Sequence, residues 1–242
     1  MIVSKENNAS EYFSDFSEIL FALSNKKDGD MSWKEGDKAT KKNRKKFFDK
    51  IGIEEENIVS MHQPHGNKVA VVEIRDKGQK IQNVDALITR EPDVFLQVTT
   101  ADCVPIFLYD PTLKIIGVVH SGWRGTAKNI AGKIVKELIK LGSKPENIMV
   151  YLGPSIKKCC YDVPKDRLKY FSQWGSVYAL EVENKSYLDL PGICREQLIK
   201  KGILLKKIVI SPACTCCNND CYSHHRDKKI EGLMVGIIGR WF

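Results

Sequence analysis

One stretch of the chain, residues 99–126 (TTADCVPIFLYDPTLKIIGVVHSGWRGT), constrains the fold more than any other. Residues 104–109 and 115–119 are rich in β-branched and aromatic side chains, and the Asp-Pro-Thr-Leu-Lys segment between them favours a turn. We therefore predict an antiparallel hairpin. If Asp110 faces Ile115, then Pro105 faces His120, and Cys103 and His120 lie at the same open end of the hairpin.

The segments around the hairpin predict an α/β architecture. Apolar residues recur at helical spacing over residues 130–141, and residues 148–152 follow as a strand. A strand, a helix and a strand in succession are typical of a βαβ unit. We expect no linker or internal repeat, and therefore a single domain over residues 1–242. Further strands are expected at residues 19–24, 58–61, 69–74, 84–89, 93–98, 208–210 and 233–238, and helices at residues 38–50, 165–174 and 190–201.

The net charge of +8 comes largely from Lys-rich segments such as residues 38–50, which are typical of solvated helix faces. The alternative is a basic nucleic-acid-binding module, but aromatic residues are not interleaved with the lysines as a stacking surface requires. No apolar run is long enough to span a membrane, and residues 1–13 do not resemble a signal peptide. We therefore expect a cytoplasmic protein with no membrane or specific nucleic-acid partner.

Eight cysteines without a secretion signal indicate reduced thiols that are available for metal binding or catalysis. The densest group is Cys214, Cys216, Cys217 and Cys221. A structural zinc site made of four cysteines usually takes two separated pairs, and this spacing is more compressed. The pattern therefore favours unliganded thiols, although His224-His225 adds ligand capacity nearby.

His65, Cys103 and His120 form a candidate metal-binding set. Each falls at the end of a predicted strand, and Pro64 and Gly66 favour a turn at His65. Two imidazoles and one thiolate suit zinc, and three protein ligands leave a fourth position open, as in catalytic zinc sites. From spacing alone, a buried core thiol with two ordinary loop histidines is the favoured interpretation.

Two further hypotheses use neighbouring residues. In a Cys-His hydrolase or deamidase, Cys103 is the nucleophile and His120 its base, and His65 is not required. Arg124 lies at the start of a predicted helix, where a guanidinium suits a phosphate or another anion. The alternative for Arg124 is packing on Trp123 or pairing with a carboxylate.

Four blocks, in this order along the chain, resemble the signature of the YfiH/YlmD family. They are Gln63 with His65-Gly66, residues 100–105 (TADCVP), residues 120–125 (HSGWRG), and residues 153–156 (GPSI) with residues 159–163 (CCYDV). The likeness extends from Asn43-Arg44 to Cys214-Thr215 and residues 223–227, and so covers most of the chain.

The resemblance implies a single α/β (α+β) domain of layered mixed β-sheets flanked by helices, with zinc bound by His65, Cys103 and His120. It also implies a purine nucleoside phosphorylase that converts adenosine, inosine, guanosine and methylthioadenosine with phosphate to the base and ribose 1-phosphate. Deamination of adenosine is a second implied activity. The family has also carried a polyphenol oxidase (laccase) label. Five histidines in the whole chain make a multicopper cluster hard to build, so we expect zinc in preference to copper.

The resemblance also suggests roles for single residues. Asp102 is the candidate proton relay in deamination. The family's Ser-x-Arg-Arg block appears as residues 223–226 (SHHR), so His225 replaces an arginine, and the loop between Ser32 and Asp37 is short. If that arginine binds phosphate in the family, binding here becomes weaker and pH-dependent. Candidate substrate and phosphate contacts are Asn43, Arg44, Gln63, Arg124 and Arg226.

Overall fold

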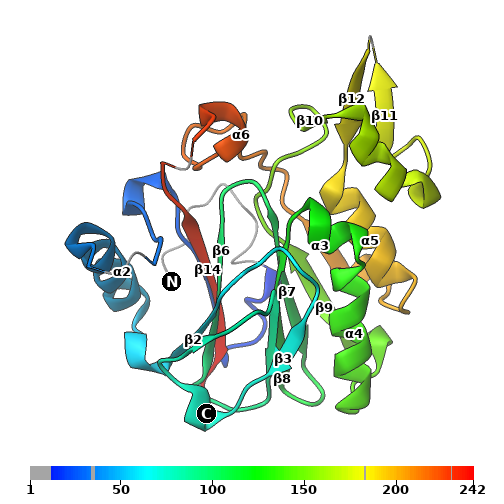
Figure 1. Cartoon of the computed structure of the whole chain (residues 1–242). Helices are drawn as coiled ribbons and strands as arrows, with labels where there is room; N and C mark the ends of the chain where they lie inside the picture. The colour runs from blue at the N-terminus through cyan, green and yellow to red at the C-terminus, as the bar shows by residue number, and fades with distance from the viewer. Residues whose placement is uncertain (1–11, 34–35, 183, 230) are drawn as a thin grey trace.

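Two stacked β-sheets lie between helices on both outer faces (Figure 1). The computed structural model describes residues 12–33, 36–182, 184–229 and 231–242. The five-stranded sheet has the order β1-β14-β6-β2-β4, and the six-stranded sheet has the order β13-β9-β7-β8-β5-β3. This arrangement confirms the predicted class of layered mixed sheets flanked by helices.

The strands of the five-stranded sheet are β1 (Ile19–Leu23), β2 (Ile58–Met61), β4 (Lys80–Ile81), β6 (Phe95–Thr100) and β14 (Met234–Arg240). Those of the six-stranded sheet are β3 (Val69–Val71), β5 (Ala86–Thr89), β7 (Val104–Asp110), β8 (Ile115–Ser121), β9 (Met149–Leu152) and β13 (Ile208–Ile210). A small third sheet contains β10 (Asp162–Val163), β11 (Ala179–Val182) and β12 (Lys185–Leu188). The helices are α2 (Lys38–Ile51), α3 (Trp123–Ala127), α4 (Ile130–Lys140), α5 (Leu190–Ile199) and α6 (His224–Asp227).

Alternating side chains on β7 separate two parts of the core. Ile106 and Leu108 pack with the apolar residues of α4 and α5, whereas Phe107 and Tyr109 pack between the two sheets. All four side chains are fully buried. Because successive side chains of a strand point to opposite faces, an apolar residue at every position indicates a strand covered on both sides.

Helix α2 covers the outer face of the five-stranded sheet. Its Phe47 and Phe48 pack against Phe95 of β6 and Val235 of β14. The Asp37 side chain accepts hydrogen bonds from the backbone N–H groups of Ala39 and Thr40 and so caps the helix.

The hairpin of β7 and β8 has the predicted register. Asp110 pairs with Ile115, and Pro105 pairs with His120. The predicted strand, helix and strand are β8, α4 and β9, but β7 lies between the two strands and pairs antiparallel with both. The connection is therefore a βαβ unit with a strand inserted between its two parallel strands.

Two predicted elements were wrong in type or length. Residues 165–174 form two 3₁₀ segments, Lys165–Tyr170 and Ser172–Trp174, in place of an α-helix. Their core-facing Leu168, Phe171 and Trp174 recur every three residues, which is the period of a 3₁₀ helix. Strand β3 is shorter than predicted, because a 3₁₀ turn with a capping box occupies Ile74–Asp76.

Among the described residues, no helix has both the length and the apolar composition that crossing a membrane requires.

Candidate metal centre

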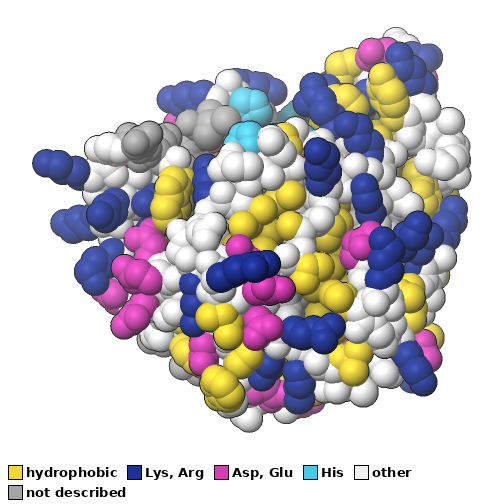
Figure 2. Space-filling model, turned by 60° about the horizontal axis from the view of Figure 1, so that its bottom comes forward, with side chains coloured by type: hydrophobic (Ala, Val, Ile, Leu, Met, Phe, Trp, Pro, Cys, Tyr) yellow, Lys and Arg dark blue, Asp and Glu magenta, His cyan; other side chains and the backbone are white. Residues whose placement is uncertain are grey.

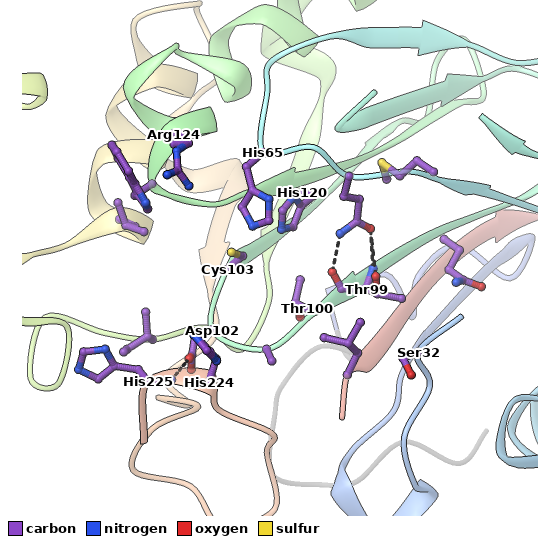
Figure 3. A pocket seen from close by; sticks show the side chains of 18 of the residues that line it. Ser32, His65, Thr99, Thr100, Asp102, Cys103, His120, Arg124, His224 and His225 are labelled. Carbon is purple, nitrogen blue, oxygen red and sulfur yellow. Dashed lines mark hydrogen bonds between the residues drawn. The ribbon is translucent and has the colours of Figure 1, made fainter. Parts of the chain in front are cut away.

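His65, Cys103 and His120 converge at one end of the sheets (Figure 3). His65 follows β2, Cys103 directly precedes β7, and His120 is the penultimate residue of β8. Their ligand atoms all lie within 4.8 Å of one another. A tetrahedral zinc site with these donors needs spacings of roughly 3.3–3.8 Å, so small side-chain rotations close the set around an ion.

Asp85 holds this group together and was missed in the sequence analysis. Its carboxylate is fully buried, and its Oδ1 lies 2.9 Å from Nδ1 of His120. The same carboxylate accepts hydrogen bonds from the backbone N–H groups of His65 (3.0 Å) and Gly66 (2.6 Å). A carboxylate behind a ligating histidine fixes the ring and leaves its other nitrogen, Nε2, for the metal. The sequence offered one indication of this role, because Asp85 directly precedes the apolar strand β5.

Cys103 and His120 are electrostatically coupled. Burial opposes ionisation of the Cys103 thiol, but the neighbouring His120 and His65 outweigh it and lower the pKa of the thiol to about 6. Burial likewise opposes charge on His120, but Cys103 and Asp85 outweigh it and raise the pKa of the imidazole to about 9. The thiolate, which is the form that binds metals and acts as a nucleophile, is therefore favoured at neutral pH.

The backbone around the ligands is unusual at two positions. His65 has φ 61° and Asp102 has φ 92°, a region that few residues other than glycine adopt. Asp102 directly precedes Cys103, and its carbonyl accepts a 2.9 Å hydrogen bond from Ile156 N. Left-handed residues that surrounding contacts hold in place concentrate at functional sites.

Gly122 lies against the ligand group. A Cβ at this position would lie 2.9 Å from Cys103 Sγ and 2.9 Å from a ring carbon of His65. No larger side chain fits there without displacing a ligand.

The three ligands open into a cavity of about 690 Å³, which falls within the range of small-molecule sites. Its lining includes apolar and aromatic side chains as well as polar groups near the ligands. The Oε1 atom of Gln97 is buried there without a hydrogen-bond partner among the described residues. The lining side chains other than the ligands include Trp33, Met61, Gln63, Gln97, Asp102, Trp123, Arg124, Ile156, Tyr161, Arg167, His224 and His225.

Two guanidinium groups line this cavity beside Trp123. Arg124 lies 4.6 Å and Arg167 lies 4.5 Å from the centre of the indole ring. Arg167 also donates a long hydrogen bond to the Tyr161 hydroxyl, at 3.4 Å. Neither guanidinium forms an ion pair with a carboxylate in the part of the chain that the structure describes. Arg167, which the sequence analysis did not select, therefore joins Arg124 as a candidate anion contact.

Asp102 and Gln63 line the cavity but are engaged by protein groups. Asp102 accepts hydrogen bonds from Thr215 Oγ1 (2.6 Å) and from the backbone N–H of His225 (2.7 Å). The Gln63 amide pairs with the backbone of Thr99 in both directions. These hydrogen bonds connect the segment before β7 with the C-terminal loop, and the loop after β2 with β6.

His225 turns its ring toward Asp162. Its Nε2 lies 2.7 Å from Asp162 Oδ1.

The remaining three predicted contacts lie outside the cavity lining. Asn43 donates a hydrogen bond to the Asp30 carbonyl. Arg44 bonds Glu55 and the Ser32 carbonyl and stacks on Trp33, so it supports two lining residues from behind. Arg226 pairs with Asp227 and donates to carbonyl groups of the C-terminal loop, including that of Thr215.

Comparisons with known proteins show the family of this chain. The model of the family described as "Multi-copper polyphenol oxidoreductase laccase" matches residues 22–241. The purine nucleoside phosphorylase YlmD of Bacillus subtilis is 35% identical over 211 residues, which are 82% of this chain and 76% of that protein. Adenosine deaminase RL5, from an unknown prokaryotic organism, is 32% identical over 184 residues, 71% of this chain and 70% of that protein.

Solved structures show the same fold. The crystal structure of the hypothetical protein YfiH of Bacillus licheniformis superposes with a TM-score of 0.90 at 28% identity, covering 96% of this chain and 95% of that one. YlmD of Geobacillus stearothermophilus superposes with a TM-score of 0.88 at 30% identity, covering 94% and 93%. The chain therefore belongs to the multi-copper polyphenol oxidoreductase laccase family, which includes YfiH and YlmD.

Proposed function

We propose that this protein is a zinc-dependent purine nucleoside phosphorylase that also deaminates adenosine. The observation that carries the proposal is the set His65, Cys103 and His120 at the wall of a cavity of about 690 Å³. Relatives named purine nucleoside phosphorylase and adenosine deaminase support the same chemistry. Adenosine, inosine, guanosine and methylthioadenosine are the proposed nucleosides, and phosphate is the second substrate.

The donor set fits zinc. Two imidazoles and one thiolate are a zinc set with one position left for substrate or water, and Asp85 supplies the outer carboxylate that such sites use. A zinc ion bound there supplies Lewis acidity for activating water or polarising the purine. A multicopper cluster needs more histidines than converge here, since among the described residues His65 and His120 are the only histidines in a ligand group.

The cavity also supports a role for its cations in phosphorolysis. Arg124 and Arg167 lie at the same indole ring without a carboxylate partner, and guanidinium groups bind phosphate through paired hydrogen bonds. A phosphate oxygen attacks C1′ of the nucleoside, the bond from C1′ to the purine nitrogen breaks, and its electron pair leaves with the purine, which takes up a proton. Holding phosphate against C1′ is the contribution expected of the two arginines.

The proton relay assigned to Asp102 stays a prediction. Both of its carboxylate oxygens accept hydrogen bonds from the C-terminal loop. This supports a positioning role, in which Asp102 sets the place of Cys103 and of the loop that carries His225.

Two measurements on the purified protein test the proposal. Metal analysis should find zinc in the wild-type protein, and Cys103→Ala and His120→Ala should each lose the ion bound at this site. Adenosine with phosphate should yield adenine, and adenosine without phosphate should yield inosine, when the products are separated by chromatography. A zinc-loaded protein that forms neither product, or a zinc-free protein that forms both at the wild-type rate, contradicts the proposal.

The second candidate is a Cys-His hydrolase or deamidase, and the lowered pKa of Cys103 beside His120 favours it. Reaction with iodoacetamide separates the two functions. A zinc-bound thiolate is shielded, so the phosphorylase should be alkylated slowly and a chelator should accelerate the reaction at Cys103. Activity should return when zinc is added to unmodified apoprotein. Fast alkylation of the metal-loaded protein, with no effect of the chelator, supports the hydrolase.

A nucleic-acid-binding module has less support. Figure 2 shows lysine and arginine side chains scattered over one face, with acidic side chains among them. A salt-dependent affinity for RNA or DNA is the observation that would favour this function.

A further inference from the structure

A second group of metal-ligating side chains lies in two loops, residues 153–161 after β9 and residues 211–223 after β13. Cys159 and Cys160 come from the first loop, and Cys214 and Cys217 come from the second. The four sulfur atoms all lie within 4.8 Å of one another, and none of the four cysteines forms a disulfide.

The measured distances approach those of a zinc tetrathiolate. Cys159 Sγ lies 3.8 Å from Cys160 Sγ and 3.8 Å from Cys217 Sγ, and Cys160 Sγ lies 3.2 Å from Cys217 Sγ. With zinc–sulfur bonds of about 2.3 Å, the sulfur atoms of a regular tetrahedron are about 3.8 Å apart. Two of the three distances equal this value, and the third is shorter but well above a disulfide bond of about 2.05 Å.

The pairing explains why the sequence pattern favoured unliganded thiols. Cys214 and Cys217 form a C-x-x-C pair, and their partners lie more than fifty residues earlier in the chain. The two other cysteines of the dense group are not members of the four. Cys221 is buried against Tyr222 and Met234, and Cys216 is outside the ligand group. A four-cysteine zinc site usually takes two separated pairs of cysteines. Here one pair comes from each loop, and the dense group in the second loop supplies only one of the two pairs.

A backbone N–H group of the first loop faces one of the four sulfur atoms. The N–H of Lys157 donates to Cys214 Sγ at 3.4 Å. Four thiolates around Zn²⁺ carry a net charge of −2, and a hydrogen bond from a backbone N–H group to sulfur stabilises such a charge.

We propose that Cys159, Cys160, Cys214 and Cys217 bind a structural zinc ion, separate from the ion at His65, Cys103 and His120. Four thiolates leave no open position, so this ion is structural and not catalytic. Zinc is chosen because soft, tetrahedral thiolate sets select it.

The second ion would join two walls of the cavity. The first loop supplies Ile156 and Tyr161 to the lining, and the C-terminal segment supplies His224 and His225. Direct contacts between the loops include the β-bridge between Ser155 and Cys214 and the hydrogen bond from Thr215 N to Ser155 O. A bound ion adds a crosslink next to Thr215, which holds Asp102. It therefore fixes the cavity wall without touching the substrate.

The number of zinc ions per chain, measured on reduced and tag-free protein, tests the proposal. Variants of each site distinguish the second ion from the first. The wild-type chain should carry close to two zinc ions. Cys160→Ser with Cys217→Ser should carry close to one, and adding His65→Ala and Cys103→Ala to this pair should leave none. Cys216→Ser, a neighbouring cysteine outside the group, is the matched control and should keep both ions.

Cobalt replacement gives a second readout that does not depend on activity. The tetrathiolate should dominate the sulfur-to-cobalt charge-transfer absorption, since the first site has one thiolate. Most of this absorption should disappear in Cys160→Ser with Cys217→Ser and persist in His65→Ala with Cys103→Ala. The Cys pair variant should also unfold at a temperature several degrees lower, roughly as expected for loss of a structural ion.

Three results would overturn the proposal. One is a wild-type zinc content that Cys160→Ser with Cys217→Ser leaves unchanged. Another is a disulfide between Cys160 and Cys217 in place of a metal, seen as protection from alkylation that a reductant removes. The third is iron in place of zinc at this group. Loss of zinc only in the His65 and Cys103 variants would leave the proposed function standing and refute the second site.

Discussion

The carboxylate of Asp85 makes three hydrogen bonds, to the ring of His120 and to the backbone of His65 and Gly66. Asp85→Asn keeps the size of the side chain but replaces one acceptor oxygen with a donor. At least one N–H group then loses its partner, and the His120 ring loses its anchor. We expect zinc affinity to fall about 10- to 100-fold, measured by competition with a chromophoric chelator.

Asp110→Asn is the matched control for that measurement. Asp110 is equally buried but lies at the other end of β7 and caps the hairpin turn through Thr112 N and Leu113 N. Its substitution should change the unfolding free energy and leave zinc affinity unaltered. Equal zinc affinity in both variants and the wild type would mean that Asp85 does not position the ligands.

Arg124 and Arg167 make a separate prediction about phosphate. Arg124→Ala and Arg167→Ala should each raise the KM for phosphate more than the KM for adenosine, because each removes a cation that has no carboxylate partner among the described residues. Initial rates at varied phosphate and fixed adenosine measure the effect. Arg75→Ala, which changes an exposed arginine paired with Glu73, is the control. Equal rises in both KM values would assign the two arginines to packing on Trp123.

At the residue scale, the sequence predicted the side chains with distinctive chemistry. His65, Cys103 and His120 were identified because thiol and imidazole groups stand out at strand ends, and the hairpin register brings two of them together. Asp85 and Arg167 were missed because an aspartate and an arginine are common in any chain. Only the folded contacts show that one is buried behind a ligand and that the other lines the cavity.

A polar cluster connects the N-terminal segment of the five-stranded sheet to the hairpin of the other sheet. Glu18, next to β1, contacts Lys114 of the hairpin turn and accepts a 2.8 Å hydrogen bond from the hydroxyl of Tyr109. Hydrogen bonds from the Lys114 ammonium, from the backbone N–H of Glu18 and from the Tyr109 hydroxyl lower the pKa of Glu18 from 4.5 to about 2. The stabilisation is therefore complete above pH 4.5 and is lost as the pH falls toward 2.

Glu18→Gln should accordingly be less stable than the wild type at pH 7, and the difference should shrink as the pH falls from about 4.5 to about 2. Urea unfolding of both proteins at a series of pH values measures this difference in the free energy of unfolding. Glu73→Gln, in an exposed pair with Arg75, should show little difference at any pH. A difference between Glu18→Gln and the wild type that stays constant down to pH 2 would show that the carboxylate charge does not contribute.

At the element scale, turn chemistry and strand patterns predicted the hairpin to the residue, because a short loop between two apolar runs permits few registers. The small sheet of β10, β11 and β12 was missed, since its strands have only two to four residues. The pairing of Cys159 and Cys160 with Cys214 and Cys217 was also missed. It depends on β9 and β13 lying parallel side by side, and no local pattern encodes that contact.

At the scale of the whole molecule, the C-terminal strand is central. β14 pairs with β1 on one side and β6 on the other, and it buries Val235, Ile237 and Ile238. Burial of three such side chains contributes roughly 5–9 kcal/mol, which is comparable with the total stability of a typical domain. Deleting residues 234–242 should therefore abolish cooperative unfolding, as measured by circular dichroism. Deleting only the exposed Phe242 should not, and a folded 1–233 protein would contradict the prediction.

The central position of β14 also affects how the chain folds as it is synthesised. Every strand of the six-stranded sheet has been made once residue 210 is complete, whereas β14 is the only pairing partner of β1 among the described residues. Strand β1 must therefore wait until residues 234–240 have left the ribosome. A ribosome-bound chain stalled before residue 234 should protect β7 and β8 from protease and leave residues 19–23 open to cleavage.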